Sequence, residues 1–428
     1  MNNSHDITKN VNNIRLLQEE NKSRRIKTEE ATSRENRNPI FSELSIEEED
    51  KQKYLLLFTN KDNYTSQECE EFWSLFQKFY HFQNKNANQY NFCEIIFPED
   101  HQKILSSLTY DKNTNFSHCT FTDKIYFSHI IFNNDVIFEN ITFKKEAIFK
   151  DTTFNNNVTF RGTRFNDWVS FKNIIIKKKL DLSFIKANDI IDLSDSTIQS
   201  INLEHSRISE LGFLRVKGHK TSSLTQKNFG NRETARIVKS HFERLNNITE
   251  SNKYFAIEQE LYLDELRNNK LFDTNKYKNI FVLYLNKYVS YFGIDWIRPL
   301  LVIFIFGFLA SFGFAFLQHG TEDINFTNSR LLLLGAFLYS LLVYYFYHKK
   351  LWVALIASII IFSTLLIGDS HLRDISNNIS KLINPLNIFK PKANYFENIA
   401  MYGMIVKLGM SVLIYQFIMA FRQNTRRK

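Results

Sequence analysis

The segment Phe132–Phe160 reads FNNDVIFENITFKKEAIFKDTTFNNNVTF, and phenylalanine returns in it at intervals of six, five, six, five and six residues. The same alternation continues on both sides of this segment. In all, eleven consecutive phenylalanines are spaced alternately by five and six residues: Phe116, Phe121, Phe127, Phe132, Phe138, Phe143, Phe149, Phe154, Phe160, Phe165 and Phe171. The chain has 41 phenylalanines in 428 residues, so chance does not produce this register. An eleven-residue period therefore decides the fold of this segment.

Two kinds of backbone can carry an eleven-residue period. Eleven residues make three turns of a slightly unwound α-helix, but at about 100° per residue neighbouring phenylalanines would lie about 140° apart. The Asn, Asp and Thr residues between them are also poor helix formers. In a strand, residues i−2 and i share a face. The positions two residues before many of the phenylalanines are small or apolar: Val136, Ile141, Ala147, Val158 and Val169, with Ile174 in the same place before Ile176.

Each unit is therefore predicted to be a short strand followed by a corner, with two side chains pointing inward and four units closing one coil. The register extends upstream to Leu105 and Tyr110. Downstream it continues through Ile176, Leu182, Ala187, Leu193, Ile198, Leu203, Ile208 and Phe213. These positions predict about five coils and a rod roughly 25 Å long at the usual inter-strand spacing.

This register resembles the pentapeptide-repeat family, in its Phe-rich variant with alternating five- and six-residue units. The resemblance implies a right-handed quadrilateral β-helix over residues 105–216, with the eleven phenylalanines as its core. The sequence departs from the family's pattern by placing bulky Ile or Val at many i−2 positions, where the family often has Ala. Burial of each ring is worth about 2–3 kcal/mol, and aromatic pairing adds about 0.5–1.5 kcal/mol.

The segments on both sides of the repeat are expected to cover its ends, because a solenoid leaves its end coils open. Residues 1–52 are predicted to be a mobile charged tail, and residues 53–104 a small helical cap. Within the cap, Thr65 and Glu68 predict a capping box. The helix that follows carries Phe72, Trp73, Leu75, Phe76, Phe79 and Tyr80. Residues 217–298 are predicted to form a juxtamembrane helical hairpin over 231–245 and 253–266, as in membrane-attached members of the family.

The C-terminal third is predicted to be an α-helical membrane domain over residues 299–428, because it contains long apolar runs. Its four expected spans are about 299–317, 331–347, 351–367 and 399–421. Arg298, the connection HKK (348–350) and the terminus RQNTRRK fall on one side of a four-span topology. The loop 368–398, with four basic residues, is discordant. The positive-inside rule then predicts a multi-pass protein of a bacterial inner (cytoplasmic) membrane, with both termini in the cytoplasm.

Residues 215–298 hold 15 Lys and Arg against 9 Asp and Glu. This excess suits attraction to anionic lipid headgroups, or it is a solvated helix face. Lys407 is the one ionisable side chain well inside an expected span, which makes it a functional candidate. It could also snorkel to the headgroups. Gly307, Ser311 and Ala315 repeat every four residues, which favours close helix packing over a pore lining.

The sequence contains no pattern typical of an enzyme. It has no HExxH, no glycine-rich phosphate loop, no GxSxG, and no His/Cys group at metal-ligand spacing. The three cysteines, Cys69, Cys93 and Cys119, are at no ligand spacing and are expected to be reduced thiols. We therefore expect no catalytic residue, no cofactor and no metal.

The function predicted from the sequence is that of a non-enzymatic scaffold or protein-interaction module on the cytoplasmic face of the membrane. Its expected partners are the lipid bilayer and a protein whose identity the pattern leaves open, as it does the oligomeric state. Some family members resemble DNA in shape and charge, but residues 105–216 hold 14 basic and 13 acidic residues, so no nucleic-acid mimicry or binding is expected. The alternative is a small channel or transporter with the β-helix as its regulatory domain. The loop IGDSHLRD (367–374) lacks a TxGYG-like run of carbonyls.

Overall fold

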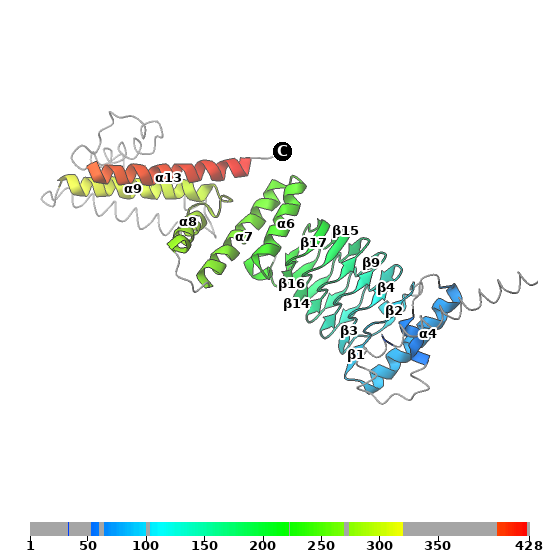
Figure 1. The fold of residues 1–428 in the computed structure, drawn as a ribbon. Helices are drawn as coiled ribbons and strands as arrows, with labels where there is room; N and C mark the ends of the chain where they lie inside the picture. Colours follow the sequence, from blue (N-terminus) through cyan, green and yellow to red (C-terminus); the bar gives the residue numbers. More distant parts are fainter. Residues whose placement is uncertain are drawn as a thin grey trace, which may run out of the picture. The chain divides into compact units, whose positions relative to one another are not determined.

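The computed structural model of the chain describes residues 33, 53–59, 64–99, 103–221, 223–268, 274–319 and 400–425. They fall in two compact units, Met1–Asn246 and Asn247–Lys428. The first unit is a β-solenoid with helices at its ends, and the second is helical (Figure 1).

The solenoid is built from short parallel strands that stack on four faces. The first face stacks β1 (Gln89–Asn91), β3 (Asn113–Asn115), β7 (Val136–Ile137), β11 (Val158–Thr159), β14 (Ile175–Asp181) and β16 (Thr197–Asn202). The second stacks β2 (Ile96–Phe97), β4 (Thr120–Phe121), β8 (Thr142–Phe143), β12 (Arg164–Phe165), β15 (Lys186–Asp192) and β17 (Arg207–Gly212). The six strand levels on each of these faces make about six coils.

The other two faces use the same coils. The third stacks β5 (Ile125–Tyr126), β9 (Ala147–Ile148) and β13 (Val169–Ser170), then the second halves of β15 and β17. The fourth stacks β6 (Ile131–Phe132) and β10 (Thr153–Phe154), then β14, β16 and β18 (Lys217–Gly218). From β14 onward, one strand continues round a corner and serves two faces, with a register shift at the corner.

The strand register explains the alternation of five and six residues. Val136 pairs with Val158 and Phe143 with Phe165, so one coil takes 22 residues, which is two fives and two sixes. Each phenylalanine of the register from Phe116 to Phe149 therefore stacks on the one 22 residues later, in the next coil. Phe138 lies 5.0 Å from Phe116 and 4.8 Å from Phe160 between ring centroids, with interplanar angles of 2° and 5°. All eleven phenylalanines of the register are at most 1% exposed.

Two of the four corners place one residue per coil in the left-handed region, with φ between 54° and 72°. One corner column is Glu94, His118, Asn140, Gly162, Phe184 and His205, and the other is His129, Asp151, Asn173, Asp195 and Arg215. Both columns lie in the five-residue intervals. The backbone N–H of each residue in the first column down to Phe184 donates to a carbonyl of the following coil, as in the 2.9 Å bond from Asn140 to Arg161. Asn, Asp and His tolerate this conformation better than other non-glycine residues.

The N-terminal end is covered by a 3₁₀ turn, Leu55–Phe58, and by α4 (Ser66–Asn86). The predicted capping box at the start of α4 is confirmed, with the Thr65 side chain and the Glu68 side chain each bonding the other's backbone N–H. The Phe76 ring of α4 lies 5.1 Å from Phe92 and 5.3 Å from Phe97. This covers the open end of the first coil.

The first coil begins at Gln89, inside the segment that the sequence assigned to the helical cap. Phe92 packs against Phe116, with ring centroids 5.0 Å apart, but the two are 24 residues apart rather than 22. The short helix α5 (Ile104–Ser107) lies within that first coil and lengthens it. The regular register therefore cannot be followed back to this coil.

The C-terminal end is closed by a 3₁₀ turn, Gln226–Asn228, and by α6 (Arg232–Arg244). The Gly230 N–H donates to the Ile201 carbonyl at 2.8 Å, and the Leu203 N–H donates to the Thr234 hydroxyl oxygen at 2.8 Å. These bonds satisfy backbone groups of the last coil that have no further coil to pair with.

The second unit contains α7 (Ile248–Asn268), α8 (Thr274–Ser290), α9 (Ile297–His319) and α13 (Ala400–Thr425). Helices α6 and α7 correspond to the two predicted helices of the hairpin, and α8 is a further helix that the sequence analysis did not name. A buried apolar cluster joins α8, α9 and α13: Val289, Ile303, Ala310, Val406, Met410 and Leu413.

The expected membrane spans fall on described and undescribed parts of the chain. The span 299–317 lies in α9 and the span 399–421 corresponds to α13. The spans 331–347 and 351–367 lie outside the described residues. Among the described residues, one helical stretch, Gly403–Gln423, is long and apolar enough to cross a membrane, and Ile297–Gly307 is a shorter apolar stretch.

Candidate functional site

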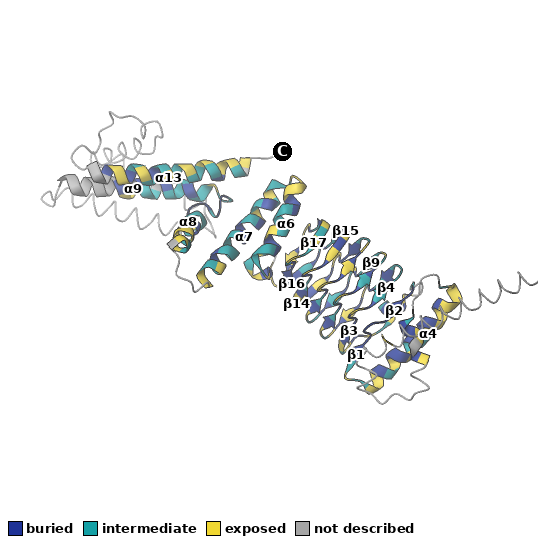
Figure 2. Ribbon diagram, in the orientation of Figure 1, coloured by how far each residue is buried: buried dark blue, intermediate teal, exposed yellow. Residues whose placement is uncertain are grey.

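The interior of the solenoid is filled by packed side chains, so recognition must use its outer surface. Figure 2 shows buried positions alternating with exposed ones along the coils. The cysteines belong to the interior: Cys119 is 1% exposed, and its thiol donates to the Phe92 carbonyl at 2.9 Å. Burial raises the pKa of Cys93 to about 11, so this thiol stays protonated and unreactive near neutral pH.

The second face of the solenoid carries a row of cations, which we call the basic row: Arg164, Lys186 and Arg207. Strand pairing places Arg164 directly opposite Lys186, and Lys186 directly opposite Arg207. All three side chains are exposed, and none of them has an ion-pair partner among the described residues. Neighbouring strands lie about 4.8 Å apart, so the row is a regular array of positive charge.

The basic row does not stabilise the sheet. Like charges directly opposite each other on neighbouring strands are destabilising, and these three are stacked without intervening acids. Helix α6 adds to the positive charge here, because the Arg244 guanidinium donates to the Ser209 carbonyl at 3.1 Å, two residues from Arg207. A charge array that costs stability is a candidate binding surface.

Sequence reasoning missed this row because the overall charge of the solenoid is close to neutral. The signal was present in the spacing, since Arg164, Lys186 and Arg207 are 22 and 21 residues apart, which is one coil each. Counting charges along the chain averages them with acids that lie on other faces.

Away from the basic row, charged side chains at the corners of the solenoid form ion pairs with one another. The Arg215 guanidinium donates to both carboxylate oxygens of Asp195, at 2.5 and 2.9 Å, and this lowers the pKa of Asp195. Amide side chains form a second ladder, in which the Asn155 side chain donates to the Asn133 side chain at 2.8 Å. These ladders join successive coils and leave little uncompensated charge at their own corners.

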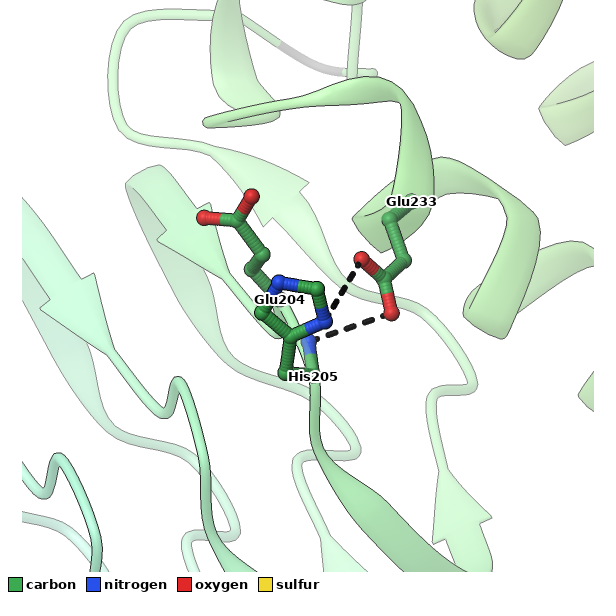
Figure 3. Close-up of side chains that lie close together, drawn as sticks. All are labelled: Glu204, His205 and Glu233. Atoms are coloured by element: carbon green, nitrogen blue, oxygen red, sulfur yellow. Dashed lines mark hydrogen bonds and ion pairs between the residues drawn. The ribbon is translucent and has the colours of Figure 1, made fainter.

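One group of side chains has the composition of a metal site. Glu204, His205 and Glu233 bring one ligand atom each within 4.8 Å of one another. The His205 Nδ1 atom lies 3.6 Å from a carboxylate oxygen of Glu233, and the His205 backbone N–H donates to the other oxygen at 3.1 Å (Figure 3). Glu204 and His205 come from the last coil, and Glu233 comes from the first turn of α6.

The predicted membrane-domain residues lie in α9 and α13. Lys407 is half-buried in α13, and its carbonyl accepts a hydrogen bond of 2.8 Å from the Ser411 hydroxyl. Gly307 is buried in α9, which also contains Ser311 and Ala315. A close approach of the two helices occurs at Gly409, where an added Cβ would lie 2.6 Å from the end of the Phe306 ring.

Comparison with known proteins bears on the repeat segment. Residues 127–175 match the family model described as Pentapeptide repeats (9 copies). No curated protein and no solved structure gives a significant match to the chain. Together, the 22-residue four-sided coil and this family model support the assignment of the repeat segment to the pentapeptide-repeat family.

Proposed function

We propose that this chain is a non-enzymatic, membrane-anchored scaffold whose solenoid binds an acidic protein surface through the basic row. The observation that carries the proposal is the direct register of Arg164, Lys186 and Arg207, which are exposed and unpaired within the described solenoid. A stack of rings fixes the coils behind the row, so the three cations are presented on a rigid support. Complementary charge on a partner relieves the repulsion between them.

Membrane anchoring is supported by the composition of the second unit. The apolar stretch Gly403–Gln423 has the length of a span, and the proposal includes the four spans expected from the sequence. Helix α8 exposes Tyr277, Phe281 and Tyr288 along one side, and it also carries Lys276 and Lys278. Aromatic and basic side chains on one helix are typical of the membrane–water interface. The proposal includes a solenoid on the cytoplasmic side, which the charge bias of the flanks supports.

Anionic lipid could attract the same cations, but a protein surface fits the row better. Lipid headgroups are mobile and need no fixed spacing between cations. A folded partner can present carboxylates that match a row with one cation per coil. Binding to lipid is therefore an outcome that the experiment must separate from binding to protein.

The test is proximity labelling from the solenoid in native membranes, with two charge-reversed triple variants. R164E/K186E/R207E removes the basic row, and K145E/K150E/K178E makes the same change in net charge at exposed lysines elsewhere on the coils. We expect the first variant to lose specific labelled proteins and the second to keep them.

A labelled protein supports the proposal only if its purified form binds the wild type, and if acid-to-lysine changes on it restore binding to R164E/K186E/R207E. Equal labelling by both variants would show that the row is not the binding surface. Loss of binding to vesicles of anionic lipid, with unchanged protein labelling, would assign the row to lipid instead. Release of the chain from membranes by alkaline carbonate would contradict the anchoring.

A further inference from the structure

The way the last coil ends places an acid beside a histidine. In the preceding coils, the N–H of each left-handed corner residue in the first column donates to a backbone carbonyl one coil further on, as Phe184 does to Glu204 at 2.9 Å. His205 has no further coil, and its N–H donates to the Glu233 carboxylate at 3.1 Å instead. Glu233 thus takes the place of a backbone carbonyl. Its second oxygen remains free to face the imidazole.

The imidazole of His205 lies between Phe184 and Glu233. Its ring lies 5.0 Å from the ring of Phe184, which occupies the same corner one coil earlier. The Arg161 guanidinium lies over the Phe184 ring, 4.5 Å from its centroid. The backbone at His205 is fixed in the left-handed conformation, with φ of 56°. Ring position and backbone therefore direct Nδ1 toward Glu233.

We propose that Glu204, His205 and Glu233 bind one divalent transition-metal ion of the Zn²⁺ type. One imidazole nitrogen and two carboxylate oxygens form a mixed donor set that suits such ions, with water completing the coordination. Bonds of about 2.0–2.1 Å in tetrahedral geometry place ligand atoms about 3.4 Å apart. The His205 and Glu233 atoms, at 3.6 Å, already approach this spacing. The Glu204 carboxylate lies within 4.8 Å of the other two ligand atoms, so the proposal requires a rotation of its side chain to close the remaining distance.

The ion would add a link between two elements that already share the bonds from Leu203 to Thr234 and from His205 to Glu233. Glu204 and His205 belong to the last coil, and Glu233 belongs to the helix that closes it. A bound ion also offsets the repulsion between the two carboxylates. The metal would thus hold α6 against the end of the solenoid.

The opposite corner provides an internal control. His129 is also a left-handed corner residue, and its Nδ1 lies 3.9 Å from a carboxylate oxygen of Asp151. This pair belongs to no three-ligand cluster among the described residues. A histidine with one carboxylate lacks the donors for a stable site, so His129 should not bind the ion tightly.

The experiment is titration of the full chain, purified in detergent without a polyhistidine tag, with ZnCl₂ by isothermal calorimetry. H205N removes the ligand but keeps a residue suited to this corner, since Asn140 adopts a φ of 54° in the same column. E233Q keeps an oxygen that can accept the His205 N–H bond and removes the charge. H129N is the matched control.

We expect wild type and H129N to bind one Zn²⁺ with the same affinity. Loss of a residue that only supports a metal ligand costs about 10- to 100-fold in affinity, so H205N and E233Q are expected to lose at least about tenfold. Zn²⁺ should also slow amide hydrogen exchange in residues 203–206 and 232–236 of the wild type and H129N, but not of H205N or E233Q. Unchanged affinity in H205N, or an equal loss in H129N, would overturn the proposal.

Discussion

Replacement of Phe149 tests whether the stacked rings hold the solenoid together. Phe149 is 0% exposed and lies between Phe127 and Phe171, with both centroid distances at 4.9 Å. Phe149→Ala removes the ring and leaves a cavity, which costs about 3–5 kcal/mol in the free energy of unfolding. Phe149→Leu keeps most of the apolar burial but removes two stacked pairs. At about 0.5–1.5 kcal/mol for each pair, the expected loss is about 1–3 kcal/mol.

The assay is urea unfolding of the full chain, followed by the β-type circular dichroism of the solenoid. Phe184→Ala is the control, because Phe184 is 46% exposed on the outside of a corner, and we expect it to cost less than about 1 kcal/mol. The reasoning fails if Phe149→Leu costs as much as Phe149→Ala, or if it costs no more than the control. Phe149→Asp buries an unpaired charge and is expected to unfold the solenoid.

Three further changes test the end closure, the pH response and the membrane domain. Thr234→Val keeps the shape of Thr234 but leaves the buried Leu203 N–H without its acceptor, so we expect it to lower the free energy of unfolding in urea by about 1–3 kcal/mol. Thr234→Ser retains the bond and is the control. Equal stability of Thr234→Val and wild type would contradict this role of Thr234. Burial lowers the pKa of His241, and the nearby Arg244 lowers it further, so the folded state favours the neutral imidazole. The stability that His241 contributes is therefore complete above about pH 6.5 and is lost on acidification. His241→Gln should therefore flatten the fall in melting temperature between about pH 7 and pH 5. Lys407→Leu should leave labelling unchanged; an ion current through reconstituted wild type that this change abolishes would refute the scaffold function.

The core of the solenoid could be predicted from the sequence because one rule repeats without interruption. Each unit of the coil buries one residue of the five-and-six register, and the chain supplies a phenylalanine at every such position from Phe116 to Phe171. The capping box at Thr65 was also readable, because it depends on two residues at a fixed local spacing. The first coil could not be predicted in this way, because α5 lengthens the interval from Phe92 to Phe116 to 24 residues.

The candidate sites were harder to predict because they depend on residues that the fold brings together from distant positions. His205 and Glu233 are 28 residues apart and meet only because α6 folds back on the last coil. Glycine did not mark the left-handed corners, since Gly162 is the one glycine among the eleven residues of the two described columns. The basic row needs the strand register before its members can be recognised as neighbours.

The closure of the last coil has a consequence for self-association. A stack of parallel strands ends in a layer of unpaired backbone groups, which is a template for the first strand of another molecule. At this end, the Thr234 hydroxyl accepts a hydrogen bond from the Leu203 N–H, and the Glu233 carboxylate accepts one from the His205 N–H. The Gly230 N–H donates to the Ile201 carbonyl. Together with α4 over the opposite end, these bonds oppose the growth of the rods end to end into fibres.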